Sequence, residues 1–102
     1  MKNIYEDKKL FVRDLSRVYS KYFREVDAIK YYKLSNLEVV EIKYFNGARS
    51  YINVNMNSNE AIAMEIIKEL YGTDEATGYI RNKESINKIK ELISKEEDSE
   101  AC

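Results

Sequence analysis

Few side chains in this sequence could perform catalysis or hold a metal ion. The chain contains no histidine, so it can form no histidine-based catalytic triad, general base or metal site. The single cysteine, Cys102, has no neighbours in sequence that would activate its thiol. The acidic pair Asp74-Glu75 could make at most a weak Mg²⁺ or Ca²⁺ contact, because it lacks the alternating acidic positions of a calcium loop. We therefore expect a protein that is not an enzyme and that uses no cofactor and no metal.

The remaining candidates are surfaces that bind a partner, and the first is a stripe of basic residues. Arg13, Arg17, Lys21 and Arg24 recur at spacings of four, four and three, which places them on one face of a helix. Such a stripe could follow a nucleic-acid backbone or steer the approach of an acidic protein. Neighbouring acids such as Asp14 could instead make ordinary ion pairs on the helix surface. The stripe is thus compatible with a nucleic-acid partner, a protein partner or a solvated face.

Tyrosine is the second signal of a binding surface. The chain has nine tyrosines and no tryptophan, and tyrosine is enriched where proteins meet because it buries a large area at a small entropic cost. We expect Tyr31-Tyr32 at the surface, and Tyr51 on the exposed side of a β-hairpin. The alternative is that the tyrosines build the core. The candidate partner-binding residues are Arg13, Arg17, Lys21, Arg24, Lys43, Arg49 and Tyr51.

The basic stripe requires a helix, and the apolar pattern predicts a long one over residues 5–30. Apolar residues recur there every three or four positions, which keeps them on one face. A helix of this length would extend for roughly 40 Å, more than so small a domain needs. Part of it could therefore pack against a partner. The residues of this apolar stripe are Phe11, Leu15, Val18, Tyr22, Val26 and Ile29.

A β-hairpin over residues 37–56 is predicted to present the other candidate residues. The segments LEVVEIKY and ARSYINVNM both alternate between apolar and polar positions, and Asn46-Gly47 marks the turn between them. A two-residue turn would place the apolar residues of the two strands on opposite faces. A three-residue loop with Gly47 in the left-handed conformation instead pairs Val40 with Ile52, and we prefer this register. Lys43, Arg49 and Tyr51 then belong to the polar side, which we expect to be exposed.

Two shorter helices are predicted after the hairpin. Asn57 or Ser58 is expected to cap a helix that ends at Gly72, and Asn82 is expected to cap a last helix. The predicted order is therefore helix, strand, strand, helix, helix.

The expected fold class is α+β, with a two-stranded antiparallel hairpin backed by helices. One domain is predicted over residues 1–95, followed by an acidic and disordered tail over residues 96–102. No segment approaches the run of about 18 apolar residues that spans a membrane, and MKNIYEDKKLF lacks the apolar core of a signal peptide. We therefore expect a cytoplasmic protein without a membrane partner.

The segment YFNGARSYINVNMNSNEAIAMEIIKELYG, residues 44–72, resembles small proteins encoded by phages and integrated elements of low-GC Gram-positive bacteria. Lys, Ile, Asn and Tyr together make 41 of the 102 residues, a bias that AT-rich codons favour. The chain is also similar to several anti-CRISPR proteins in size, acidity and helix-hairpin-helix order. This resemblance implies a stoichiometric inhibitor that binds an RNA-guided nuclease. The net charge of -1 differs from that of strongly acidic, DNA-mimicking members, and no functional residue is carried over.

The leading hypothesis is a mobile-element protein that inhibits a host protein by binding it, with a CRISPR effector nuclease as the expected partner. The first alternative is a small accessory or regulatory protein that binds nucleic acid through the basic stripe. The second is a structural module whose first helix pairs with its own copy to form a homodimer.

Overall fold

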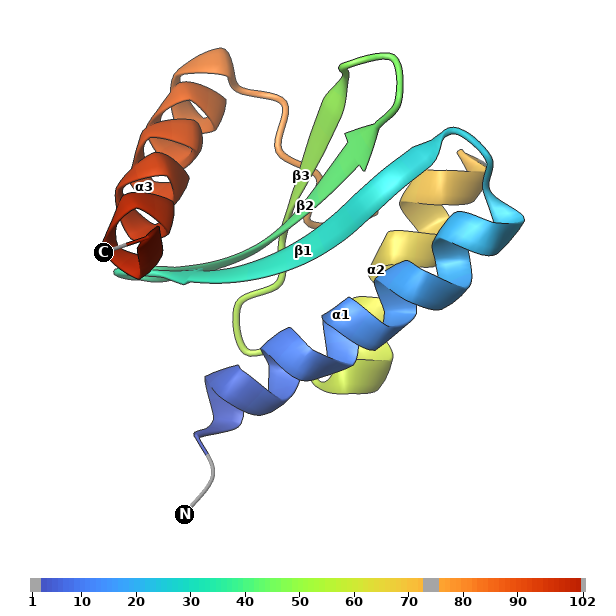
Figure 1. The fold of residues 1–102 in the computed structure, drawn as a ribbon, viewed down its shortest axis with the longest axis horizontal. Coiled ribbons are helices and arrows are strands. Elements are labelled where there is room, and N and C mark those ends of the chain that lie inside the picture. The colour runs from blue at the N-terminus through green and yellow to red at the C-terminus, as the bar shows by residue number, and fades with distance from the viewer. Residues whose placement is uncertain (1–2, 73–75, 102) are drawn as a thin grey trace.

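The protein folds as an antiparallel three-stranded sheet with helices on both faces (Figure 1). The computed structural model describes residues 3–72 and 76–101, except for the side chains of residues 97–101. The expected α+β class is confirmed, with three strands in place of two. In chain order the elements are α1 (Ile4–Tyr22), β1 (Val26–Leu34), β2 (Leu37–Tyr44), β3 (Arg49–Asn53), α2 (Asn59–Tyr71) and α3 (Lys83–Ala101).

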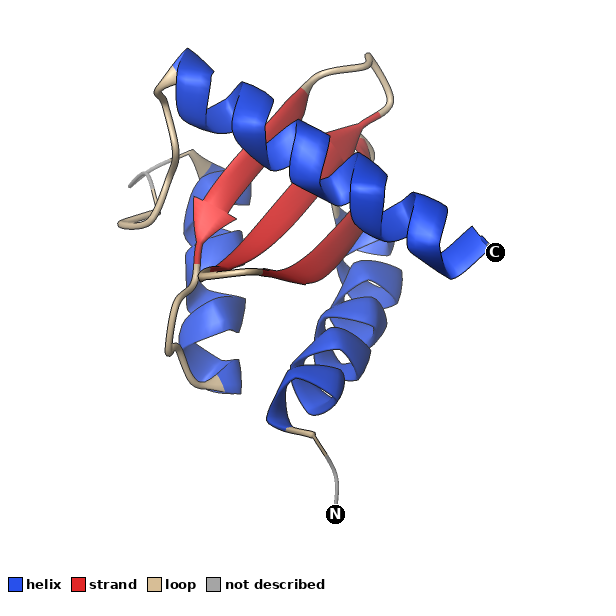
Figure 2. Ribbon diagram, turned by 90° about the vertical axis from the view of Figure 1, so that its left-hand side faces the viewer, coloured by secondary structure: helices blue, strands red, loops and turns tan. Residues whose placement is uncertain are grey.

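The sheet is the middle of three layers. α1 and α2 cover one face, and α3 crosses the other (Figure 2). β2 lies between β1 and β3, so its residues from Glu38 to Ile42 are all buried. A strand that is covered on both faces loses the usual alternation between buried and exposed residues. The buried residues of the core between α3 and the sheet are Leu34, Val39, Tyr51, Ile89 and Ile93. The larger core under α1 and α2 includes Val12, Ile29, Tyr31, Val40, Ile42, Ile52, Ile62 and Ile66.

The single long helix expected over residues 5–30 is wrong. α1 ends at Tyr22, and the chain then turns into β1. A β-bulge between Val26 and Ala28 adds one residue to β1, so Val26 and Ile29 both point into the core although they are three residues apart. This spacing imitates that of a helix. The β-branched and aromatic residues of β1 favour a strand over a helix.

The predicted register of the second hairpin is confirmed. Val40 pairs with Ile52, and the Tyr44 N–H donates to the Ala48 carbonyl oxygen at 2.9 Å. Gly47 has φ = 90°, a conformation that residues with a Cβ rarely adopt. The three-residue loop therefore lets β2 and β3 place their apolar residues on the same face.

The predicted helix ends are also confirmed. The Ser58 hydroxyl accepts from the Ala61 N–H at the start of α2, and Gly72 ends α2 in the left-handed conformation. The Asn82 side chain accepts from the first N–H groups of α3. Where a disordered tail is expected from residue 96, the described backbone is helical to Ala101. Cys102 and the pair Asp74-Glu75 lie outside the described residues. None of the described helices is long and apolar enough to span a membrane.

The two edges of the sheet differ. The edge of β3 is covered by residues 76–80, because the Asn53 N–H donates to the Gly78 carbonyl oxygen at 2.7 Å and the Ile80 N–H donates to the Tyr51 carbonyl oxygen at 2.9 Å. A Cβ atom on Gly78 would collide with the Asn53 carbonyl group, so glycine is required for this approach. β1 pairs only with β2, and no other described strand or bridge lies along its outer edge.

We expect Gly78→Ala to detach residues 76–80 from β3. The added methyl group must push the Asn53 carbonyl away, which should lower the free energy of unfolding by about 1–3 kcal/mol, the usual cost of overpacking. Amide hydrogen exchange should become faster at Asn53 and Ile80 and remain unchanged at Ile42 in the central strand. Unchanged protection at Asn53 would show that the loop does not depend on glycine at this position.

Candidate partner-binding site

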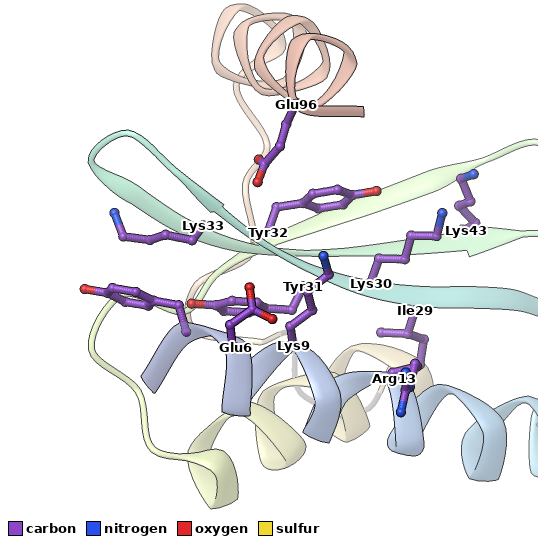
Figure 3. Close-up of a pocket in the computed structure, with 11 residues that line it drawn as sticks. Glu6, Lys9, Arg13, Ile29, Lys30, Tyr31, Tyr32, Lys33, Lys43 and Glu96 are labelled. Carbon is purple, nitrogen blue, oxygen red and sulfur yellow. The ribbon is translucent and has the colours of Figure 1, made fainter. Parts of the chain in front are cut away.

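A basic groove runs along the open edge of β1, between α1 and α3 (Figure 3). Its volume is about 450 Å³. Five consecutive residues of β1, residues 29–33, line it. Successive side chains of a strand point to opposite faces of the sheet, so a cavity that touches all five must lie along the edge of the strand. The other lining residues are Tyr5, Glu6, Lys9 and Arg13 from α1, Lys43 from β2 and Glu96 from α3.

One hydrogen bond shows which main-chain groups of β1 face the groove. The Ile29 N–H donates to the Ser16 hydroxyl of α1 at 2.9 Å, so it points away from β2. In an antiparallel pair, alternate residues direct both their N–H and their C=O to the same side. The main-chain groups of Tyr31 and Lys33 therefore also point away from β2, toward the open edge. Those of Lys30 and Tyr32 point toward β2.

The described residues give the groove a positive charge, with five basic side chains against two carboxylates. Lys30 and Lys43 lie on the α3 side of β1 (Figure 3). The Lys33 ammonium lies 5.2 Å from the centre of the Tyr5 ring, a cation–π contact. It also donates to the carbonyl oxygens of Leu34 and Ser35 at 3.0 and 2.9 Å. The groove thus combines cationic groups with tyrosine rings, which can contact an acidic partner.

A buried ion pair holds α1 opposite the edge of β1. Glu38 of β2 accepts from the Lys8 ammonium of α1 at 2.7 Å and from the Tyr31 hydroxyl at 2.8 Å. Its second carboxylate oxygen accepts from the Met56 N–H at 2.8 Å. Burial by itself raises the pKa of this carboxyl, but the three hydrogen bonds and the charge of Lys8 outweigh burial and hold the pKa below its ordinary value. The wall of the groove is therefore fixed by a network that reaches into the core.

The groove contains two of the seven residues singled out from the sequence. Arg13 and Lys43 both line it. Arg17 and Lys21 are exposed on α1 outside the groove, and Arg24 lies in the turn between α1 and β1. The expected helical stripe of four is therefore wrong at Arg24, because the helix ends before it.

The predicted exposure of Tyr51 is wrong, and so is that of Tyr31, which is 4% exposed. The Tyr51 side chain is only 1% exposed, because α3 covers the face that was expected to be open. The Tyr51 hydroxyl donates to Glu41 at 2.8 Å. Burial, followed by this hydrogen bond, raises the pKa of Tyr51 to about 12. Arg49 is exposed and pairs with the same Glu41 carboxylate at 3.3 Å. Tyr51 is therefore part of the core under α3, where it is hydrogen-bonded to the buried Glu41.

Sequence reasoning missed most of the groove. Tyr5, Lys9, Lys30, Tyr32 and Lys33 line it and were not among the predicted residues. The signal was present, since residues 30–33 read Lys-Tyr-Tyr-Lys, which in a strand places one lysine and one tyrosine on each face, and lysine is common on edge strands. It was hidden because residues 26–30 were assigned to a helix.

Among the described side chains, no group of three or more Cys, Asp or Glu residues is placed to hold a metal ion. In the comparisons with known proteins, no family model, no curated protein and no solved structure matches the chain.

The Glu38 network predicts a loss of stability in acid. The pKa of Glu38 is lower in the folded protein than its ordinary value of 4.5, so the folded protein binds this proton more weakly than the unfolded chain does. The carboxylate therefore stabilises the fold above about pH 4.5, and this contribution is lost as the pH falls through the lower, folded pKa. We expect Glu38→Gln to lower the free energy of unfolding by about 3 kcal/mol at neutral pH, because Lys8 is left buried without an anion.

Urea unfolding at a series of pH values measures both effects. The Glu38→Gln variant should also show a weaker dependence on acid than the wild type. Glu91→Gln on α3 is the matched control, because the Glu91 side chain is 68% exposed. Equal losses of stability for the two variants at neutral pH would contradict the role assigned to Glu38.

Proposed function

We propose that this protein acts by binding an acidic surface of another protein, without catalysing a reaction, and that the basic groove along β1 makes the contact. The observation that carries this proposal is the position of the groove, where cationic side chains surround the open edge of a strand. Its lysines have apolar stems and lie beside Tyr5 and Tyr32, so a bound partner can bury area as well as satisfy charge.

The biological role that we propose is inhibition of a host defence nuclease by a protein of a phage or mobile element. This part of the proposal rests on the resemblance of residues 44–72 to such proteins. Those residues comprise the turn between β2 and β3, the edge strand β3, and α2, which packs against the sheet. The groove lies on the opposite edge of the sheet. In the proposed inhibitor, residues 44–72 thus provide the scaffold and the edge of β1 provides the contact.

A second candidate function is binding of nucleic acid. Arg13, Arg17 and Lys21 are exposed on α1, and Arg13 also lines the groove, so the basic surface continues along the helix. Such a surface would bind duplex DNA with a steep dependence on salt. The affinity for an acidic protein would depend less on salt than the affinity for DNA, because burial of tyrosine area also contributes to binding and is not screened by salt.

Capture from host lysate treated with nuclease tests the function. The tagged wild-type protein should retain a partner in stoichiometric amount, and Lys30→Glu/Lys33→Glu/Lys43→Glu should lose it, because reversed charges repel an acidic surface. The matched control is Lys83→Glu/Lys88→Glu/Lys90→Glu, which makes the same change of charge at exposed positions of α3. All three proteins should unfold at similar urea concentrations.

The captured protein, once purified, should bind the wild type and the α3 control equally and bind the groove variant at least about tenfold more weakly, as expected for the loss of a few surface ion pairs. If it is a nuclease, its activity should fall when the wild type is added. Equal capture by the groove variant would exclude the groove as the contact. Recovery of nucleic acid alone, from untreated lysate, would favour the second candidate function.

A further inference from the structure

We infer that the groove binds an extended, acidic segment of the partner, which adds to the sheet as a fourth strand beside β1. This inference rests on the proposed function and specifies how the partner is held. Strand addition gives affinity through main-chain hydrogen bonds and specificity through the side chains that flank them.

The first observation is the difference between the two edges of the sheet. Residues 76–80 cover the edge of β3 through main-chain hydrogen bonds to Tyr51 and Asn53. β1 has nine residues, is longer than β3 and, among the described residues, pairs with β2 alone. Unpaired main-chain groups along an edge form a template for another strand. The edge of β1 is therefore available for pairing with another strand, whereas the edge of β3 is already occupied.

The second observation locates the template within β1. The Ile29 N–H is already bound to the Ser16 hydroxyl, so pairing cannot start there. The main-chain groups of Tyr31 and Lys33 point to the same side as that of Ile29, because they lie two and four residues further along the strand. An incoming strand would therefore pair with β1 around residues 31–33, where α1 and α3 form the two walls of the groove (Figure 3).

The third observation is charge. Side chains of an added strand alternate between the two faces of the sheet, so they would meet basic residues on both sides. Lys30 and Lys43 face the α3 side, and Lys9, Arg13 and Lys33 line the groove from α1 and from the α1 face of β1. Acidic side chains on both faces of the added strand would therefore be paired.

The same charges oppose pairing between two copies of this chain. If two β1 edges met, each copy would bring an excess of basic side chains to the same contact, and like charges across a strand pair are destabilising. Lysines on an edge strand commonly prevent such self-association. The edge thus rejects a second copy and accepts a strand of opposite charge.

A synthetic peptide tests strand addition directly. The probe is a peptide of about eight residues, a common strand length, in which adjacent pairs of Glu are separated by Val and Thr, so that both faces of the strand carry carboxylates. A control peptide has the same side chains with its main-chain N–H groups methylated, which removes hydrogen-bond donors and keeps the charge. Fluorescence anisotropy measures the affinity of each, and a single-stranded DNA oligonucleotide of similar charge serves as the competing ligand.

We expect the unmethylated peptide to bind at least about tenfold more tightly than the methylated one, as the loss of two or three net hydrogen bonds predicts. It should also bind more tightly than the DNA. Lys30→Glu/Lys33→Glu should weaken peptide binding, and Lys88→Glu/Lys90→Glu should not. Equal affinity of the two peptides, or tighter binding of DNA, would overturn the inference.

Amide hydrogen exchange, followed by NMR, locates the added strand. Saturating peptide should slow exchange at Tyr31 and Lys33 and leave Ile29 unchanged, because the Ile29 N–H already has a partner. Peptide binding without protection of Tyr31 and Lys33 would reduce the groove to an electrostatic contact and overturn strand addition. Protection that appears without peptide and rises with protein concentration would identify a second copy as the occupant and also overturn the inference.

The two proposals fail differently. If partner capture depends on Lys30, Lys33 and Lys43 but the peptide does not protect the β1 amides, the proposed function stands and strand addition is wrong. If partner capture is unaffected by the groove variant, the proposed function itself is wrong, whatever the peptide does.

Discussion

The buried carboxylate of Glu38 is the interaction on which the rest of the structure depends. It lies on the central strand and joins Lys8 of α1, Tyr31 of β1 and the Met56 N–H that precedes α2. A buried charge costs several kcal/mol unless its partners stay in place. α1 therefore cannot slide along the sheet without exposing or orphaning this group. The position of α1 in turn places Lys9 and Arg13 opposite β1, so the buried ion pair also determines the shape of the groove.

The small size of the sheet explains why its edges are treated so differently. A sheet of three strands needs a packed hydrophobic face for stability, and here α1 and α2 pack on one face and α3 packs on the other. The helices leave the edges uncovered. Residues 76–80 form main-chain hydrogen bonds along the edge of β3, and lysine side chains lie along the edge of β1. In the proposed function, the lysines that prevent self-association along this strand also select an acidic partner.

In the proposed function, the scaffold and the partner contact are formed by different parts of the chain. The hairpin and helix over residues 44–72 have the clearest local signals in the chain, and they form the support of the sheet. The groove is built by residues 29–33 with α1 and α3, where the local signals conflict. This division is physically reasonable, because a supporting element must be stable by itself, whereas an edge strand must remain able to pair.

The sequence by itself determined the features that short-range chemistry controls. The hairpin register follows from Gly47 and from the alternation around Val40, and the helix ends follow from Ser58, Gly72 and Asn82. The tertiary structure decided the rest. A bulge gave residues 26–29 helical spacing within a strand, and α3 buried Tyr51 on a face that reads as polar. Of the residues that line the groove, the sequence predicted only Arg13 and Lys43 as partner-binding. Periodicity indicates which side chains share a face of one helix or strand. It does not indicate which other element will cover that face.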